Sequence, residues 1–403
     1  MIFVKTTDES FNANFEELLG RGKMDIANVS AIVGNIIDEI KKDKNAALKK
    51  HISKFDNWTP ESDEDLMISV ESMEKAYNNI DEKLKKALHL SYDRIKVYHE
   101  KQKPKSWFDT ESNGTILGQK VTPVDSAGLY IPGGKAAYPS SLLMNVIPAQ
   151  VAGVENIVVC TPTPDNEPNE LLLAACHLCG VTQVYKVGGA SAIAAMAYGT
   201  ENIPKVDVIT GPGNIFVATA KKMVFGEVNI DMIAGPSEIG ILADESANAN
   251  HLAIDMLSQA EHDEMASSIL ITPSQKLADE VKIELEQWLL KLPRQEIARK
   301  SIEERGAIIV SRDMDEAIKL MNDIAPEHLE VATNSPFELL PFIKHAGAIF
   351  LGHNTPEAIG DYVAGPNHTL PTGGTAKFYS PLGVENFMKK TSIISFSSKA
   401  INE

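Results

Sequence analysis

Histidines that stand near carboxylates or carboxamides are the residues best suited to chemistry in this chain. Gln259 and His262 lie three residues apart near the end of a predicted helix, residues 247–263, so both side chains share one face. Asp361 and His368 bracket a loop whose Gly-Pro pair can fold it back. Carboxylate and imidazole suit zinc or another borderline divalent ion, and carboxamide oxygen is a less common ligand. The spacing is compatible with a metal site, and equally with capping or surface residues.

A second candidate is the adjacent pair Glu327 and His328. It follows Ala325 and Pro326 at a predicted helix-to-strand junction, where the proline pushes Ala325 out of the helical region. A neutral imidazole can accept a proton at physiological pH, and a neighbouring carboxylate can orient it or activate water. Neighbours on a regular strand point to opposite faces, so joint action requires irregular backbone here. A surface pair is the alternative.

The remaining histidines and the cysteines are interpreted as structural. We expect His51, His89 and His99 on the surface of charged helices. Cys176 and Cys179 have a metal-like spacing, but no second pair completes a zinc site, and with Cys160 the odd number cannot build a disulfide framework. The cysteines are therefore expected to be small buried hydrophobic residues.

The elements that must position these residues follow from the hydrophobic pattern. Residues 1–105 are predicted to be helical, with periodic apolar positions among many charges. From residue 121 onward, short β-branched runs alternate with helical patterns, which indicates parallel sheets covered on both faces. The predicted strands are 128–131, 156–160, 183–187, 206–209, 240–243, 268–271, 307–310 and 348–351. Eight strands suit two sheets, with a break near 231–238.

Five segments rich in glycine and proline are predicted to gather where ligands bind. In open α/β sheets that place is beyond the carboxyl ends of the strands. Glycine there lets backbone N–H groups approach a ligand, and a following helix N-terminus favours anions. The segments are 131–134, 187–190, 211–214, 235–237 and 365–368. None is a G-x-G-x-x-G fingerprint, so a regular dinucleotide site is not supported.

Composition excludes several classes of protein. The chain has 403 residues, with 43% hydrophobic and 23% charged residues, which is typical of globular domains and long enough for two or more of them. A net charge of −17 without a basic cluster argues against a nucleic-acid partner. No apolar run approaches the length that crosses a bilayer, and the N-terminus is not a signal peptide, so we expect a cytoplasmic protein without a membrane partner.

Taken together, six ordered segments resemble the histidinol dehydrogenase family. They are 128–134, 211–217, 231–238, 258–263, 325–330 and 365–372. The resemblance implies two open parallel-sheet α/β domains, incomplete Rossmann-like, with a helical N-terminal region and a short C-terminal extension. The expected boundaries are a helical segment 1–25, a first domain of 26–127 with 238–380, a second domain of 128–237, and a C-terminal segment 381–403.

The resemblance also implies a ligand set and catalytic roles. Gln259, His262 and Asp361 match the family's zinc ligands, and the zinc mainly positions the substrate, L-histidinol. His328 matches the general base, which also contacts the substrate, and Glu327 the residue that activates water. Ser237 and His368 are expected to contact substrate, as are the zinc ligands.

NAD binding and partners are implied in the same way. Tyr130 and Asn214 match NAD contacts, and Ser191 stands where the family has a glutamine. Two hydride transfers at one site, alcohol to aldehyde and aldehyde to acid, would use two NAD in turn. An isologous homodimer is expected. The family's final stretch, with a Glu and a fourth zinc ligand for the partner subunit, has no counterpart in these residues; zinc then keeps three protein ligands with water filling in.

Two alternatives remain open from the sequence. One is a related NAD-dependent dehydrogenase of another small amino or sulfonated alcohol, because histidinol specificity depends partly on that final stretch. The other is a non-catalytic relative that keeps the fold and binds NAD or metal. Glu327 and His328 argue for a catalyst, whereas Ser191 argues for the binder.

Overall fold

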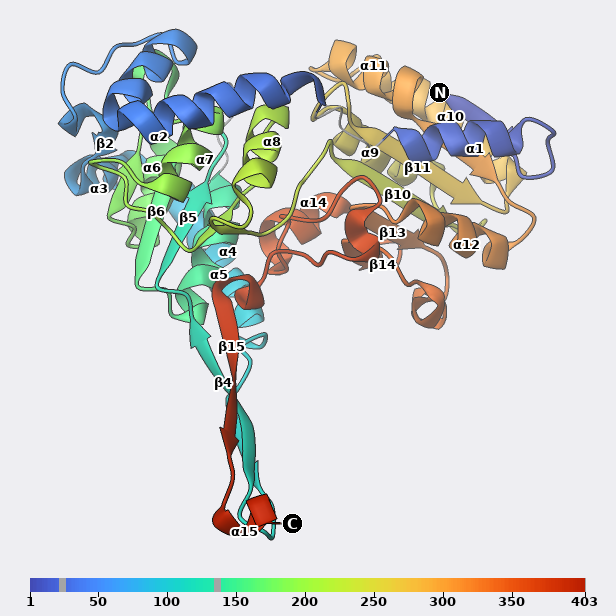
Figure 1. Ribbon diagram of the computed structural model, residues 1–403. Coiled ribbons are helices and arrows are strands. Elements are labelled where there is room, and N and C mark those ends of the chain that lie inside the picture. Colours follow the sequence, from blue (N-terminus) through green and yellow to red (C-terminus); the bar gives the residue numbers. More distant parts are fainter. Residues whose placement is uncertain (22–26, 134–138, 403) are drawn as a thin grey trace. The chain divides into compact units, whose positions relative to one another are not determined.

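The computed structural model describes residues 1–21, 27–133 and 139–402. The chain divides into two compact units. Unit 1 comprises residues 1–28, 232–364 and 368–381, and unit 2 comprises 29–231, 365–367 and 382–403. Each unit is built around one six-stranded sheet (Figure 1).

Unit 1 contains an entirely parallel sheet in the order β1-β12-β11-β10-β13-β14. Its strands are β1 (Ile2–Lys5), β10 (Glu238–Ala243), β11 (Ser267–Thr272), β12 (Ala307–Val310), β13 (His328–Ala332) and β14 (Ala348–Leu351). Its helices are α1 (Phe11–Gly20), α9 (Ala249–Ala260), α10 (Gln275–Leu289), α11 (Gln295–Arg305), α12 (Met314–Ile324), α13 (Pro336–Leu339) and α14 (Glu357–Ile359), with a π-helix at Gly360–Ala364.

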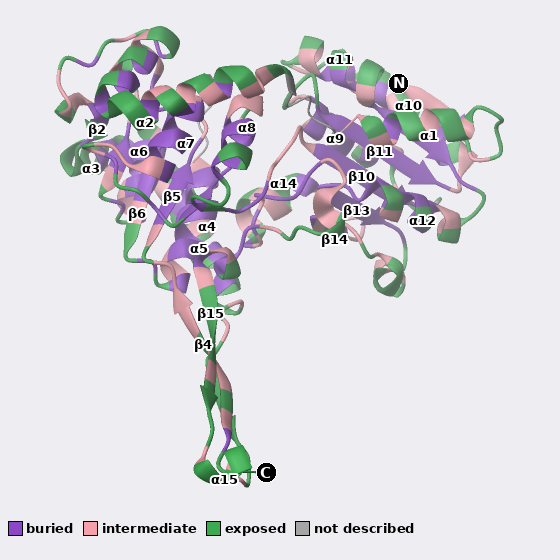
Figure 2. Ribbon diagram, in the orientation of Figure 1, coloured by how far each residue is buried: buried purple, intermediate pink, exposed green. Residues whose placement is uncertain are grey.

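Helices cover both faces of this sheet because successive strand residues point to opposite sides. In β10, Ile239 and Ile241 pack with α9, α10 and α11, whereas Leu242 packs with α1 and α12. A sheet buried on both faces needs continuous apolar strands. Figure 2 shows the inner strands β10, β11 and β13 as buried, whereas the edge strands β1 and β14 are only partly buried.

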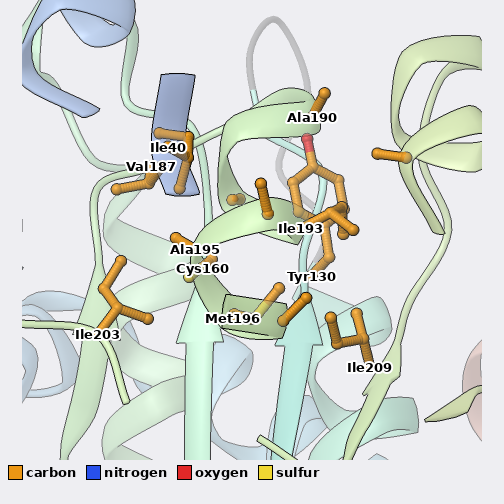
Figure 3. Packing of buried hydrophobic residues seen from close by; sticks show 14 of the residues in the cluster. Ile40, Tyr130, Cys160, Val187, Ala190, Ile193, Ala195, Met196, Ile203 and Ile209 are labelled. Carbon is orange, nitrogen blue, oxygen red and sulfur yellow. The ribbon is translucent and has the colours of Figure 1, made fainter. Parts of the chain in front are cut away.

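Unit 2 contains a second sheet in the order β2-β7-β6-β5-β8-β9, in which only β2 is antiparallel to its neighbour. Its strands are β2 (Met67–Ile68), β5 (Ser126–Tyr130), β6 (Asn156–Cys160), β7 (Gln183–Tyr185), β8 (Val208–Thr210) and β9 (Asn229–Ile230). Its helices are α2 (Ala27–Phe55), α3 (Val70–Asn79), α4 (Glu82–Glu100), α5 (Pro139–Ala152), α6 (Glu170–Leu178), α7 (Gly189–Tyr198) and α8 (Ile215–Val224). Figure 3 shows Ile40 of α2, Ile193 of α7 and Tyr130 of β5 in one apolar core.

A three-stranded antiparallel arm extends from unit 2 (Figure 1). It consists of β3 (Trp107–Thr110), β4 (Ile116–Pro123) and β15 (Met388–Ser395), followed by α15 (Ser398–Asn402). β15 pairs with β4 over eight residues, which fixes the end of the chain to a segment about 270 residues earlier. Large apolar side chains on this arm are exposed: Trp107 52%, Phe108 67%, Ile394 68% and Phe396 54%.

The predicted α/β class with two parallel sheets is confirmed, and a strand lies at each of the eight predicted positions. The N-terminal region differs from the prediction, because residues 2–5 and 67–68 are edge strands rather than helix. The grouping of residues also differs from the expected boundaries. Residues 29–127 belong with unit 2, because α2 packs on α7 and α4 packs on α5. The expected boundary at 25/26 and Gly134 lie outside the described residues.

Candidate functional site

The candidate catalytic residues lie at the amino ends of the unit 1 strands. β10 and β13 are parallel neighbours with Ile239 opposite His328, so Glu238, the first residue of β10, lies beside Glu327, which directly precedes β13. The segments rich in glycine and proline were expected beyond the carboxyl ends of the strands. Segment 235–237 instead precedes β10, so this expectation is wrong for unit 1. The reason is topological: a helix that links two parallel strands returns the chain to the amino edge, so helix C-termini gather there.

His328 is held on both ring nitrogens at this edge. Its Nδ1 lies 3.1 Å from the carbonyl oxygen of Glu238, and its Nε2 lies 3.1 and 3.2 Å from the carboxylate oxygens of Asp361. Glu327 lies on the other side, with Oε2 3.7 Å from Nδ1 and accepting a hydrogen bond from the N–H of Glu238 at 2.9 Å. The predicted helix-to-strand junction is present, and Ala325 is left-handed, with φ 52° and ψ 62°. The irregular backbone that joint action requires therefore directly precedes the pair.

Burial and charge shift the proton affinities of this pair in different ways. Burial raises the pKa of Glu327 to about 8, although His328 opposes the shift. Burial alone lowers the pKa of His328, but the carboxylates of Glu327 and Asp361 outweigh it, and the pKa lies well above its usual value. An imidazole that donates from both nitrogens is the arrangement expected for this charge environment.

Gln259 and His262 come to the same edge at the end of α9. Gln259 is buried in the last turn, and the N–H of His262 donates to the carbonyl of Gln259 at 3.2 Å just past the helix. Desolvation by surrounding protein lowers the pKa of His262, with Asp361 and His328 among the charges that act on it. A neutral imidazole at the negative end of a helix is well placed to bind a cation.

Glu357 is a functional candidate that the sequence analysis missed. With the amide of Gln259 oriented so that its nitrogen donates, that nitrogen lies 2.6 and 3.1 Å from the two oxygens of Glu357. Its carboxylate also accepts from Ser258 at 3.2 Å, and Oε1 lies 4.0 Å from Nε2 of His328. Glu357, Asp361 and His328 each offer a ligand atom within 4.8 Å of the others. The only sequence signal was a carboxylate four residues before Asp361, one helical turn away.

His368 has a side-chain atom available for a ligand, and Ser237 lies just before the start of β10. The Nε2 of His368 is buried without a hydrogen-bond partner among the described residues, and burial lowers the pKa of this imidazole. An unpaired buried nitrogen is costly unless a ligand satisfies it. Ser237 immediately precedes β10, and its carbonyl accepts from the N–H of Ser267 at 3.0 Å, which fixes the backbone there.

Asp255 and Glu330 form a buried pair of carboxyl groups close to Glu357. Burial raises the pKa of Glu330 to about 9, and the charge of Asp255 and their mutual hydrogen bond act in the same direction. Burial also raises the pKa of Asp255. Glu330 therefore keeps its proton at neutral pH and can donate it to Asp255.

This proton makes a pH-dependent stability effect testable. An unfolded Glu330 ionises near its usual value of about 4.3, whereas the folded one stays protonated to about pH 9. Between these values the folded state binds more protons, so its stability falls as pH rises. Glu330→Gln, which keeps a donor toward Asp255, is expected to flatten this decline between pH 6 and 8.5. Urea unfolding at both pH values checks it, and an unchanged decline would contradict it.

The predicted nucleotide residues of unit 2 lie at the carboxyl edge of its sheet, as expected. The N–H of Gly189 donates to the hydroxyl of Tyr130 at 3.2 Å, and burial raises the pKa of that phenol to about 12. Asn214 is exposed and caps α8, its Oδ1 accepting from the N–H groups of Phe216 and Val217. Ser191 lies in the first turn of α7. Tyr130 thus ends β5, Ser191 lies in the helix that follows β7, and Asn214 lies in the loop that follows β8.

The loop that precedes Asn214 is fixed by a buried ion pair. Lys221 and Asp231 pair with side-chain exposures of 3% and 0%. Lys221 donates to the carbonyl of Gly211 at 2.9 Å, and Asp231 accepts from the N–H of Gly211 at 2.9 Å. Gly211 has φ +115°, and a Cβ there would lie 2.0 Å from the carbonyl oxygen of Tyr130. Only glycine fits this close approach of two backbones.

Two structural interpretations of histidines are wrong, and that of the cysteines is confirmed. His51 and His99 are 5% and 0% exposed rather than on the surface. His99 Nδ1 lies 2.7 Å from the carbonyl of Ile95, within its own helix. His89 is exposed as expected. The three cysteines are free and buried, and burial raises the pKa of each thiol.

Comparison with known proteins identifies the family of the whole chain. The histidinol dehydrogenase family model matches residues 19–403. Histidinol dehydrogenase of Sulfurimonas denitrificans is 84% identical over 403 residues, covering 100% of this chain and 94% of that protein. The Wolinella succinogenes histidinol dehydrogenase is 68% identical over 393 residues, covering 98% and 91%. The crystal structure of histidinol dehydrogenase from Elizabethkingia anophelis matches with a TM-score of 0.94 at 34% identity, covering 100% of this chain and 92% of that one. Among the described residues, no helix has both the length and the apolar character to cross a membrane.

Proposed function

Because the chain belongs to the histidinol dehydrogenase family, we propose that it catalyses the zinc-requiring, NAD-dependent four-electron oxidation of L-histidinol to L-histidine through the aldehyde. The observation that supports this most is the arrangement of His328 between Glu327 and Asp361, with Gln259 and His262 at the same strand edge. It combines a base, a second carboxylate and a set of metal-binding side chains in one unit.

The residues present fit a divalent cation. Two carboxylates, Glu357 and Asp361, crowd one side of His328, and burial raises the pKa of Glu357 to about 7. A cation bound there would offset the repulsion between these groups and displace the proton that burial favours on Glu357. Gln259, His262 and Asp361 would hold the zinc, and Glu357 would orient the amide of Gln259 by accepting its N–H. Zinc would position the amino and imidazole nitrogens of histidinol.

His328 would act as the general base for the alcohol and then for the hydrated aldehyde. The contact of Nε2 with Asp361 at 3.1 Å and the raised pKa of His328 favour a proton on Nε2. Engagement of Asp361 with a cation would weaken that contact and leave Nε2 able to accept the proton of the substrate. Nδ1 would remain bonded to the carbonyl of Glu238, which fixes the ring. Glu327, whose raised pKa makes it a competent base near pH 8, would activate the water that adds to the aldehyde.

The nucleotide and the remaining substrate contacts complete the proposal. Tyr130, Ser191 and Asn214 would contact NAD, which supplies the hydride acceptor for both oxidations. The unpaired Nε2 of His368 and the hydroxyl of Ser237 would contact the substrate.

A homodimer and a cytoplasmic location remain predictions. The exposed apolar residues of the β3-β4-β15 arm, such as Phe108 and Ile394, support a dimer, because a second copy would remove them from water. Light scattering should then give twice the chain mass of 43.9 kDa.

The test of the function is NADH formation from L-histidinol together with zinc content. Two NADH per histidinol and about one zinc per chain are expected. His262→Ala should lose both zinc and turnover, because it removes an imidazole ligand. His251→Ala, at an exposed histidine of α9, should keep both. Zinc retained in His262→Ala would contradict the ligand set, and NAD binding without histidinol turnover in the unmodified chain would favour another alcohol substrate or a binding role.

A further inference from the structure

A hydrogen-bonded chain of three side chains connects the first turn of α7 to α2. The Oγ of Ser191 lies 2.9 Å from Nδ1 of His51, and Nε2 of His51 lies 3.0 Å from Oε2 of Glu39. Ser191 and His51 are 4% and 5% exposed. The side chains of Ser191 and His51 therefore satisfy one another where they are buried between α2 and α7, whereas the side chain of Glu39 is 40% exposed.

A break in α2 builds this contact. Glu39 and His51 are twelve residues apart, which on a straight helix corresponds to about 18 Å of rise. Lys44, with φ 46° and ψ −121°, interrupts the helix and lets the two halves approach. The next residue, Asn45, is buried, and its side chain donates to Asp63 and Asn202. The turn is thus anchored independently of the His51–Glu39 contact.

Glu39 determines where the proton of His51 resides. It also pairs with Lys50 at 2.8 Å, and these hydrogen bonds from Lys50 and His51 lower the pKa of Glu39. A carboxylate only accepts, so Nε2 of His51 carries the hydrogen. In the neutral imidazole Nδ1 is then the acceptor, and the hydroxyl of Ser191 must donate to it. The lone pairs of the Ser191 oxygen are what remains for a ligand.

We infer that His51 and Glu39 are positioning residues that hold Ser191 as a hydrogen-bond acceptor in the nucleotide site. This rests on the proposed function, in which Ser191 contacts NAD. The group that Ser191 then suits is a donor, a ribose hydroxyl or the carboxamide N–H, and not a phosphate oxygen. Among the described residues a Cβ at Gly189 would meet nothing within 4 Å, so the start of this turn is open to a ligand.

The test measures NAD affinity of the full chain at pH 8.5 by calorimetry, with KM and kcat for NAD in the histidinol assay. His51→Leu is expected to raise the dissociation constant about tenfold, the size of one ordinary hydrogen bond. The loss should lie mainly in KM rather than kcat. Ser191→Ala should give a similar loss, and the double variant about tenfold rather than a hundredfold, because both changes remove the same interaction. Ser53→Ala, on the same helix with its hydroxyl bonded to the carbonyl of Lys49, is the matched control.

An NAD analogue separates the two donors. The 3-acetylpyridine analogue lacks the carboxamide N–H, so it should be insensitive to His51→Leu if Ser191 contacts the carboxamide, and tenfold sensitive if it contacts a ribose hydroxyl. NAD affinity within twofold of the unmodified chain in folded His51→Leu would overturn the inference. If that variant does not fold, Glu39→Gln serves, since an amide no longer fixes the tautomer, and unchanged affinity there is equally decisive. Failure of the unmodified chain to bind NAD would instead overturn the proposed function, and this inference with it.

Discussion

His328→Gln is expected to lower kcat for histidinol oxidation by about 10³-fold, within the range that a positioned general base contributes. Glutamine can donate to the carbonyl of Glu238 as Nδ1 does, but its amide cannot take up a proton near neutral pH. Both oxidations depend on the same base, so both should slow. Stopped-flow measurement of NADH formation, with circular dichroism to verify the fold, tests this.

A companion variant distinguishes the roles of the two neighbours. Glu327→Gln keeps a hydrogen-bond acceptor for the N–H of Glu238 but cannot activate water. Single-turnover assays should then approach one NADH per site, because the alcohol step proceeds and the aldehyde step stalls. His251→Gln, exposed on α9, controls for loss of a histidine. Near-normal kcat in His328→Gln would show that another group is the base.

The strands of both sheets could be predicted because their burial on two faces leaves a direct trace in the sequence. β11 and β12 are continuous runs of buried apolar or small residues, and the predicted ranges agree with them within a residue or two. The sequence of β13 is not a continuous run of apolar residues. It carries His328 and Glu330 among its five buried residues, and hydropathy alone treats these as surface positions.

The arm and the edge of the site depend on pairings that a local pattern does not encode. β15 contains Lys389 and Lys390 and is largely exposed, so only its register with β4 identifies it as a strand. The neighbours of His328 likewise follow from strand order. Glu238 and Glu327 lie 89 residues apart in the chain and meet only because β13 joins the sheet beside β10.

The same limitation applies to the buried polar contacts. Lys221 and Asp231 lie only ten residues apart, but nothing local shows that both side chains leave water. His51 lies among charged residues, which made the surface the simplest prediction. Its partner Ser191 is 140 residues away, and the break at Lys44 that brings Glu39 to it has no glycine or proline to mark it.

Lys221→Met is expected to destabilise unit 2 by about 3–5 kcal/mol, the usual result of removing one partner of a buried ion pair. Asp231, with a side-chain exposure of 0%, would lose its cationic partner, and the carbonyl of Gly211 would lose its donor. A loss of this size is a large part of the free energy of unfolding of an ordinary domain. Urea unfolding measures it. In a Trp288→Phe background the remaining tryptophans, Trp58 and Trp107, both lie in unit 2 and report its transition.

Lys222→Met is the matched control, because Lys222 is exposed on the same turn of α8 and its loss should change the free energy of unfolding by less than about 0.5 kcal/mol. A small effect for Lys221→Met as well would mean that water or a rearranged loop compensates Asp231. The functional consequence separates these outcomes. Lys221 donates to the carbonyl of Gly211 and Asp231 accepts from its N–H, three residues before Asn214. A loop without these hydrogen bonds should bind NAD more weakly even at temperatures where unit 2 stays folded. A loop in which water or a rearrangement compensates Asp231 should keep its NAD affinity.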